Sequence, residues 1–206
     1  MNSLNNELRI NIGYYGPGVS GKTSNLVYIY TSLTPDVKGG LVSLKIRGDR
    51  RIAFDFVIPE IGTIGGKTPR FYLFCAPGCV RYPESHAAVL AEADAIVFVA
   101  DSQADRLEAN IEMLSEMKKT LLHQGRTMEN FSWIIQYNKR DLPNVAPIQE
   151  LQLKLNPYRV PYFEAVANQR IGVFETLKAI IDLKIANFRQ RRDHRILLGT
   201  KPYYVS

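Results

Sequence analysis

Apolar residues in this chain alternate between short runs with strand character and longer stretches with helical spacing. The expected strands are residues 8–15, 51–58, 70–75 and 95–101, and the expected helices are residues 23–33, 106–122 and 172–188. The last of these strands is continuously apolar, as in a strand buried on both faces. The alternation predicts an α/β fold in which helices flank both faces of a mostly parallel central sheet. In such folds, ligands bind at the carboxyl ends of the strands.

A glycine-rich segment stands between the first expected strand and the first expected helix. Its sequence, GPGVSGKT, matches the phosphate-binding pattern GxxxxGK[ST]. Phosphates need several backbone N–H donors at close range, and glycine lets the main chain approach and turn without a clashing Cβ. We expect Lys22 to contact the β- and γ-phosphates and Thr23 to bind Mg²⁺. The alternative is a glycine-rich turn before an ordinary helix, which the strand–loop–helix context disfavours. The expected phosphate-site residues are Gly16, Gly18, Val19, Ser20, Gly21, Lys22, Thr23 and Ser24.

A second motif, NKRD at residues 138–141, follows the apolar run at residues 133–137. Guanine presents N1–H and its exocyclic amine as adjacent donors, and the carboxylate of Asp141 can accept from both. Adenine offers no such pair and would leave that carboxylate unpaired. We expect Lys139 to lie along the base and Asn138 to tie this loop to the phosphate loop. A polar turn is the alternative for this motif alone, but the two motifs together predict a site for GTP and GDP.

The composition fits one globular domain with a substantial core, because the 206 residues are 46% hydrophobic and 22% charged. The residues expected in the core on the last two helices are Leu107, Ile111, Leu114, Met117, Leu121, Val173, Leu177, Ile180, Ile181, Ile185 and Phe188. Two cysteines make no disulfide framework, which favours a reducing compartment. Because we find no membrane-spanning run, secretory pattern or lipidation motif, we expect a cytoplasmic protein without an integral membrane anchor.

The formal net charge is +6, and part of it is concentrated near the end of the chain. Such a cluster suits an anionic partner, but we favour the alternative, a solvated end of a C-terminal helix. No interleaving of aromatic and basic residues suggests RNA recognition, so we expect no nucleic-acid partner. We divide the chain into a domain at residues 1–190 and a basic, tyrosine-containing tail at 191–206. The cluster consists of Arg189, Arg191, Arg192, His194 and Arg195.

Several motifs together resemble the MglA family of bacterial Ras-like small GTPases, which act in gliding motility and cell polarity. These are the phosphate loop, FDF at 54–56, APG at 76–78, VFVADS at 97–102, NKRDLP at 138–143 and EAVA at 164–167. The likeness extends in register from about residue 10 to about residue 188. It implies a Ras-like G domain that cycles between GTP and GDP forms, with the GTP form recruited to a cell pole. It also implies an MglB-like Roadblock activator and response-regulator or TPR-type polarity effectors.

The resemblance also implies functional residues outside the two nucleotide motifs. An arginine finger supplied in cis falls on Arg50, which would act in catalysis together with Lys22. Gly78 would sense the γ-phosphate. A backbone N–H near Val166 and Ala167 would read the guanine carbonyl.

Two positions near the γ-phosphate depart from the pattern. Cys75 stands where most Ras-like proteins have a Mg²⁺-linked Asp, which MglA-type proteins also lack, and Cys79 stands where the family keeps a Gln that orients the attacking water. A thiol is a weak donor and acceptor and cannot replace that amide. We therefore expect slow hydrolysis that depends on Arg50 and on a partner. Asp55 or Asp49 is the candidate for holding a metal-bound water, although Asp55 also fits the polar face of a strand.

Two other functions fit parts of the sequence. A GTP-bound scaffold that hydrolyses poorly and recruits polar effectors is favoured by Cys79. An ATP-using phosphoryl-transfer enzyme would also have a phosphate loop, but the NKRD motif and the lack of an evident arginine-rich lid argue against it.

Overall fold

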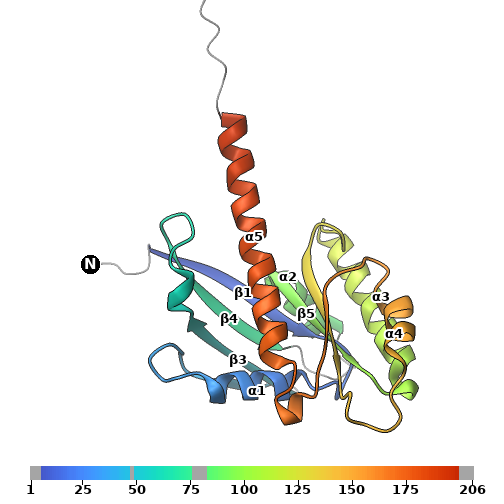
Figure 1. The fold of residues 1–206 in the computed structure, drawn as a ribbon. Coiled ribbons are helices and arrows are strands. Elements are labelled where there is room, and N and C mark those ends of the chain that lie inside the picture. The colour runs from blue at the N-terminus through green and yellow to red at the C-terminus, as the bar shows by residue number, and fades with distance from the viewer. Residues whose placement is uncertain (1–5, 47–48, 76–82, 200–206) are drawn as a thin grey trace, which may run out of the picture.

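The structure is a computed structural model that describes residues 6–46, 49–75 and 83–199. Side chains are described at residues 6–43, 52–75 and 86–190. Within these ranges, seven strands form one sheet in the order β2-β3-β4-β1-β5-β6-β7 (Figure 1). The pairs β2–β3 and β3–β4 are antiparallel and the others are parallel. The strands are β1 Glu7–Tyr15, β2 Val42–Ile46, β3 Asp49–Val57, β4 Thr68–Cys75, β5 Ala95–Asp101, β6 Ser132–Asn138 and β7 Tyr162–Glu164.

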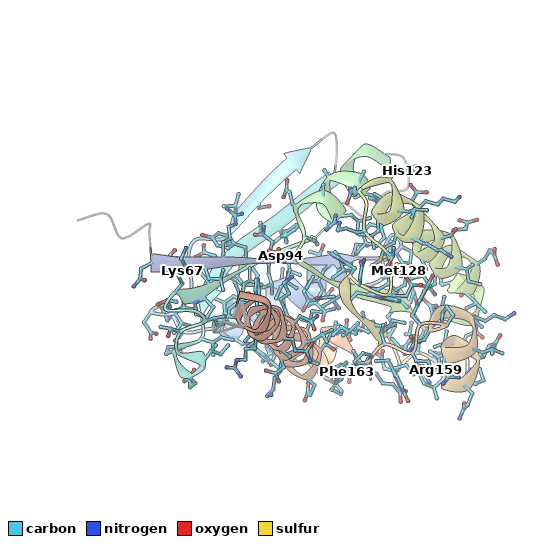
Figure 2. The ribbon with its side chains drawn as sticks, turned by 90° about the horizontal axis from the view of Figure 1, so that it is seen from above. Lys67, Asp94, His123, Met128, Arg159 and Phe163 are labelled. Atoms are coloured by element: carbon cyan, nitrogen blue, oxygen red, sulfur yellow. The ribbon has the colours of Figure 1, made fainter. Side chains whose placement is uncertain are left out.

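Helices cover both faces of the sheet and enclose two hydrophobic cores, as the sequence predicted. Helices α1 and α5 pack on one face, and α2, α3 and α4 pack on the other. Figure 2, seen from above, shows α5 and α3 on opposite sides of the sheet. The helices are α1 Lys22–Ser32, α2 Pro83–Glu92, α3 Leu107–His123, α4 Ile148–Leu155 and α5 Val173–Gly199.

The long apolar patterns predicted their elements well. The strand expected over residues 95–101 is confirmed with the same bounds, and every residue in it is buried. On α3, Leu114, Met117 and Leu121 are buried, whereas Leu107 and Ile111 are partly buried against the same core. On α5, the expected inward residues are buried except Phe188, which packs against the core from a partly buried position.

The sequence did not predict β2, α2, α4 or β7. Strand β7 has only three residues and an exposed Tyr162, so it has too few positions to show a period of two. Strand β2 lies at the edge of the sheet, where Val42 is exposed and the core does not impose an apolar alternation.

Helix α5 extends beyond the body of the fold. It continues to Gly199, past the predicted boundary at residue 190, and its end projects from the domain in Figure 1. The division into a domain and a tail stays a prediction, but the boundary falls within a helix. In the part of the chain that the structure describes, no helix is both long and apolar enough to cross a membrane.

The sheet order brings the two sequence motifs together at the carboxyl ends of neighbouring strands. The phosphate loop follows β1, which is central and pairs with both β4 and β5. Asp101 ends β5 and Asn138 ends β6, and these two residues are register partners. Because β1, β5 and β6 are parallel, the residues that follow them meet at their carboxyl ends.

Candidate nucleotide-binding site

The phosphate loop has a backbone that requires glycine at two positions. Gly16 has a φ of 139° and Gly21 a φ of 102°. A Cβ on Gly16 would lie 2.3 Å from the backbone oxygen of Val99, and one on Gly21 would lie 2.0 Å from Nδ2 of Asn138. The glycines of the motif therefore allow the loop to pack closely on β5 and on the guanine motif.

Polar groups in this loop match the chemistry of a phosphate. Lys22 is 4% exposed, and its Nζ donates to the backbone oxygens of Gly16 at 2.8 Å and Pro17 at 2.6 Å. The Ser20 hydroxyl is buried and has no hydrogen-bond partner among the described residues. An unsatisfied buried hydroxyl is costly, and a phosphate oxygen would satisfy it. A buried cation, an unpaired hydroxyl and a glycine-shaped loop at the start of α1 together fit a phosphate group.

The first turn of α1 supplies a candidate ligand for Mg²⁺. Thr23 and Ser24 are both exposed there, directly after the loop. Magnesium keeps several waters and takes only one or two protein oxygens beside the phosphate oxygens. The Thr23 hydroxyl fits the role of a single protein ligand to an ion that would neutralise phosphate charge.

Asn138 joins three segments of the site. Its Nδ2 donates to the backbone oxygen of Ser20 at 2.7 Å, and its Oδ1 accepts from the backbone N–H of Ala167 at 2.9 Å. The side chain is buried, so these hydrogen bonds are protected from water. The predicted tie between the guanine motif and the phosphate loop is therefore present, and it extends to the segment EAVA at 164–167.

The other guanine-motif residues lie near this junction. Asp141 is exposed, and its Oδ2 accepts from Nε2 of Gln169 at 3.2 Å. Val166 is buried beside Ala167. Because the Ala167 N–H already donates to Asn138, contact between that N–H and the guanine carbonyl requires a shared or exchanged hydrogen bond, and it stays a prediction.

A buried carboxylate at the end of β5 was not assigned a role from sequence. Asp101 is 1% exposed, and its Oδ2 accepts from Nζ of Lys139 at 2.6 Å. The Asn110 side chain on α3 donates to the backbone oxygen of Asp101 and accepts from its N–H, which fixes this turn. Lys139 has a φ of 67°, which is uncommon for a residue other than glycine. The sequence signal was the single charged residue that closes an otherwise apolar strand.

Arg106 was also missed, because it stands outside both nucleotide motifs. It lies just before α3, and its Nη2 donates to the backbone oxygen of Gly18 at 3.1 Å. Its Nε lies 3.9 Å from Oδ2 of Asp101. A cleft of about 380 Å³ lies beside it, lined in part by Val19 and Met113.

Asp55, the sequence candidate for a metal-linked carboxylate, forms an ion pair. Its Oδ2 lies 2.7 Å from Nη1 of Arg70, which also donates to Glu7. The hydrogen bonds that Arg70 donates to Glu7, which has the larger effect, and to Asp55 hold the pKa of Arg70 above its ordinary value. The geometry supports the alternative in which Asp55 belongs to the polar face of β3, and we do not include it in the proposed site.

The residues expected around the γ-phosphate are described only in part. Arg50 and Asp49 belong to β3, but their side chains lie outside the described residues. Gly78 and Cys79 also lie outside the described residues. Cys75 is buried at the end of β4, as expected for a small residue closing a strand.

A second cleft lies at the opposite end of the fold from both nucleotide motifs. It measures about 520 Å³ and is lined by loops around Met128 and Arg159 and by one face of α5. Figure 2 looks onto this end and labels both residues. The length of the strands separates this cleft from the phosphate loop, so we assign the cleft no part in nucleotide binding.

The chain is 42% identical over 190 residues to the Mutual gliding-motility protein MglA of Myxococcus xanthus (strain DK1622). The alignment covers 92% of this chain and 97% of that protein. No family model matches the chain. The likeness therefore extends over nearly the whole fold and is not confined to a phosphate loop.

Proposed function

This chain belongs to the MglA family of Ras-like small GTPases, and we propose that it is a GTP- and GDP-binding molecular switch that controls cell polarity and motility. The observation that carries the nucleotide part of this proposal is the junction at Asn138, which bonds to Ser20 of the phosphate loop and to Ala167. A phosphate loop and a guanine motif fixed to each other form one site that is selective for a guanine nucleotide. Asp141 would accept from the guanine N1–H and amine, and Thr23 would hold Mg²⁺.

Hydrolysis in this proposal is slow and depends on a partner. Arg50 would act as the cis arginine finger, with Lys22 on the phosphates and Gly78 sensing the γ-phosphate. Cys79 cannot orient water as an amide does, because a thiol is a weak donor and acceptor. Support comes from the family membership and from the position of Arg50 at the start of β3, in the hairpin with β2.

Multiple-turnover phosphate release tests the hydrolytic proposal, with and without a Roadblock-type activator. We expect Cys79→Gln to raise the rate and Arg50→Ala to lower it by at least tenfold. Arg51→Ala is the matched control, because it removes the same charge one residue along β3. If the Cys79→Gln variant releases phosphate no faster than wild type, the Cys79 thiol is not the cause of slow turnover.

The partners and location follow from the family alone. We propose an MglB-like Roadblock activator, response-regulator or TPR-type effectors, and a cytoplasmic protein whose GTP form is recruited to a cell pole. A GTP-loaded protein should retain such an effector on a column, whereas the GDP-loaded protein should not. Equal retention of both forms would contradict a switch.

A GTP-bound scaffold that hydrolyses poorly is the second candidate, and Cys79 is the observation that favours it. The two candidates differ in one measurement. GTP that stays intact in the presence of an activator indicates the scaffold, and activator-stimulated conversion to GDP indicates the cycling switch.

A further inference from the structure

Arg106 links the phosphate loop to the start of α3. Its Nη2 donates to the Gly18 backbone oxygen at 3.1 Å, across 88 residues of sequence. The Arg106 side chain is 37% exposed, so the contact is at the edge of the site rather than in the core. A cationic donor makes a stronger hydrogen bond to a carbonyl than a neutral one does.

The Gly18 carbonyl fixes the orientation of the next N–H. The peptide between Gly18 and Val19 is trans, so its C=O and its N–H point in opposite directions. With the carbonyl directed at the Arg106 guanidinium, the Val19 N–H points away from that side chain. Residues with positive φ in such loops turn successive N–H groups into a concave, anion-binding arrangement. Val19 has a φ of 64°.

This backbone conformation is unfavourable for valine. A β-branched residue in the left-handed region is a genuine outlier and needs its surroundings to hold it there. The Val19 side chain is 84% exposed, so packing of that side chain does not supply the restraint. The hydrogen bond from Arg106 to the preceding carbonyl is a restraint that acts directly on this peptide.

Asp101 connects the same arginine to the guanine motif. Its Oδ2 lies 3.9 Å from Nε of Arg106 and 2.6 Å from Nζ of Lys139. The carboxylate is buried, and its backbone is clamped by Asn110. The fixed carboxylate of Asp101 therefore faces both Arg106, which holds the phosphate loop, and Lys139 of the guanine motif.

We infer that Arg106 is a positioning residue for nucleotide affinity. It holds the Gly18–Val19 peptide with the Val19 N–H toward the phosphates, and Asp101 couples it to Lys139. The inference rests on the proposed function, because it assigns a role in binding the same nucleotide. Arg106 acts through the backbone of Val19, and it is not a catalytic residue.

Dissociation of a fluorescent GDP analogue from the full chain with Mg²⁺ tests this inference. We expect Arg106→Ala to raise the dissociation rate about tenfold, as for the loss of one charge-assisted hydrogen bond. Arg9→Ala is the matched control, because Arg9 is an exposed arginine on β1 that stacks on Tyr72. An Arg106→Ala rate equal to that of wild type would overturn the inference.

A double-mutant cycle separates positioning of the peptide from a general structural role. Glycine adopts a φ of about 64° without the penalty that valine incurs, so the loop in Val19→Gly needs less restraint. In the Val19→Gly background, we expect Arg106→Ala to change the dissociation rate by less than about threefold. A full tenfold effect in that background would show that Arg106 does not act through the Val19 peptide.

The two proposals fail in different ways. Wild-type protein that does not bind the GDP analogue overturns the proposed function and the inference with it. Wild-type protein that binds the analogue, together with an Arg106→Ala variant that releases it no faster, overturns the inference alone.

Discussion

The side-chain amides of Asn25 and Gln136 form a reciprocal pair between α1 and β6. Nδ2 of Asn25 donates to Oε1 of Gln136 at 2.8 Å, and Nε2 of Gln136 donates to Oδ1 of Asn25 at 3.0 Å. Both side chains are buried, and Gln136 also donates to Thr176 on α5. The pair joins the helix that follows the phosphate loop to the strand that leads into the guanine motif.

Replacing Gln136 by Leu should destabilise the fold. The substitution removes the donor to Oδ1 of Asn25, whereas Nδ2 of Asn25 still donates to the Gly21 backbone oxygen at 3.0 Å. An unsatisfied buried polar atom costs more than a made hydrogen bond contributes. We expect a loss of about 2–3 kcal/mol in the free energy of unfolding, measured by urea denaturation. The double variant Asn25→Leu/Gln136→Leu should be less destabilised than the sum of the two single variants, and strict additivity would contradict the pairing.

Replacing Gly21 by Ala should separate the two motifs. The new Cβ would meet Nδ2 of Asn138 at 2.0 Å, and the φ of 102° disfavours any side chain. Asn138 would have to leave the Ser20 carbonyl, so we expect loss of GDP affinity by at least tenfold together with a lower melting temperature. Gly66→Ala is the control, because it has positive φ but nothing within 4 Å of its Cβ. Equal GDP affinities for both variants would contradict the account.

The stability of the protein should fall at alkaline pH. Burial raises the pKa of Tyr14 above its ordinary value of about 10, and burial also raises the pKa values of Tyr15 and Tyr137. Above about pH 10 the unfolded chain releases these phenolic protons while the folded protein retains them, so the stabilisation present below that pH is lost as the pH rises.

Tyr14→Phe should reduce this alkaline loss of stability. The Tyr14 hydroxyl is buried with no partner among the described residues, so its removal should cost nothing at pH 7 and should stabilise by up to about 1 kcal/mol. Thermal melting at about pH 9 and pH 11 measures the difference. An identical loss of stability in Tyr14→Phe and wild type would argue against the role of this hydroxyl.

Asp141→Asn should reduce the discrimination between guanine and hypoxanthine. Wild type should bind GDP more tightly than IDP, because IDP lacks the exocyclic amine that the carboxylate accepts from. In the variant this ratio should fall toward one, as competition against a fluorescent nucleotide would show. An unchanged ratio would mean that another group reads the amine.

The sequence predicted the parts of the site where residue type and spacing carry the chemistry. The phosphate loop and the NKRD motif predict their roles from residue type and spacing, and the apolar run at 95–101 predicted a buried central strand, which the structure confirms. Asp101 and Arg106 escaped prediction because their partners, Lys139 and Gly18, lie 38 and 88 residues away. Their importance follows from the sheet order, which a single sequence does not reveal.

Asp55 illustrates the opposite difficulty. Its type and position suited a metal-linked carboxylate, but the strand pairing β3–β4 brings Arg70 beside it, and Arg70 also pairs with Glu7 on β1. An aspartate on a strand carries the same sequence pattern whether it faces a metal or an arginine. The long-range ion pair with Arg70 favours a place for Asp55 on the polar face of β3.

The most direct test of the central claim is the identity of the nucleotide that the protein binds and turns over. Purified protein is denatured to identify what it releases, and protein loaded with GTP is then followed over time with Mg²⁺ and a Roadblock-type activator. The account predicts release of a guanine nucleotide and slow conversion of GTP to GDP that the activator accelerates. Release of an adenine nucleotide, or equal competition by ATP and GTP for the site, would contradict it.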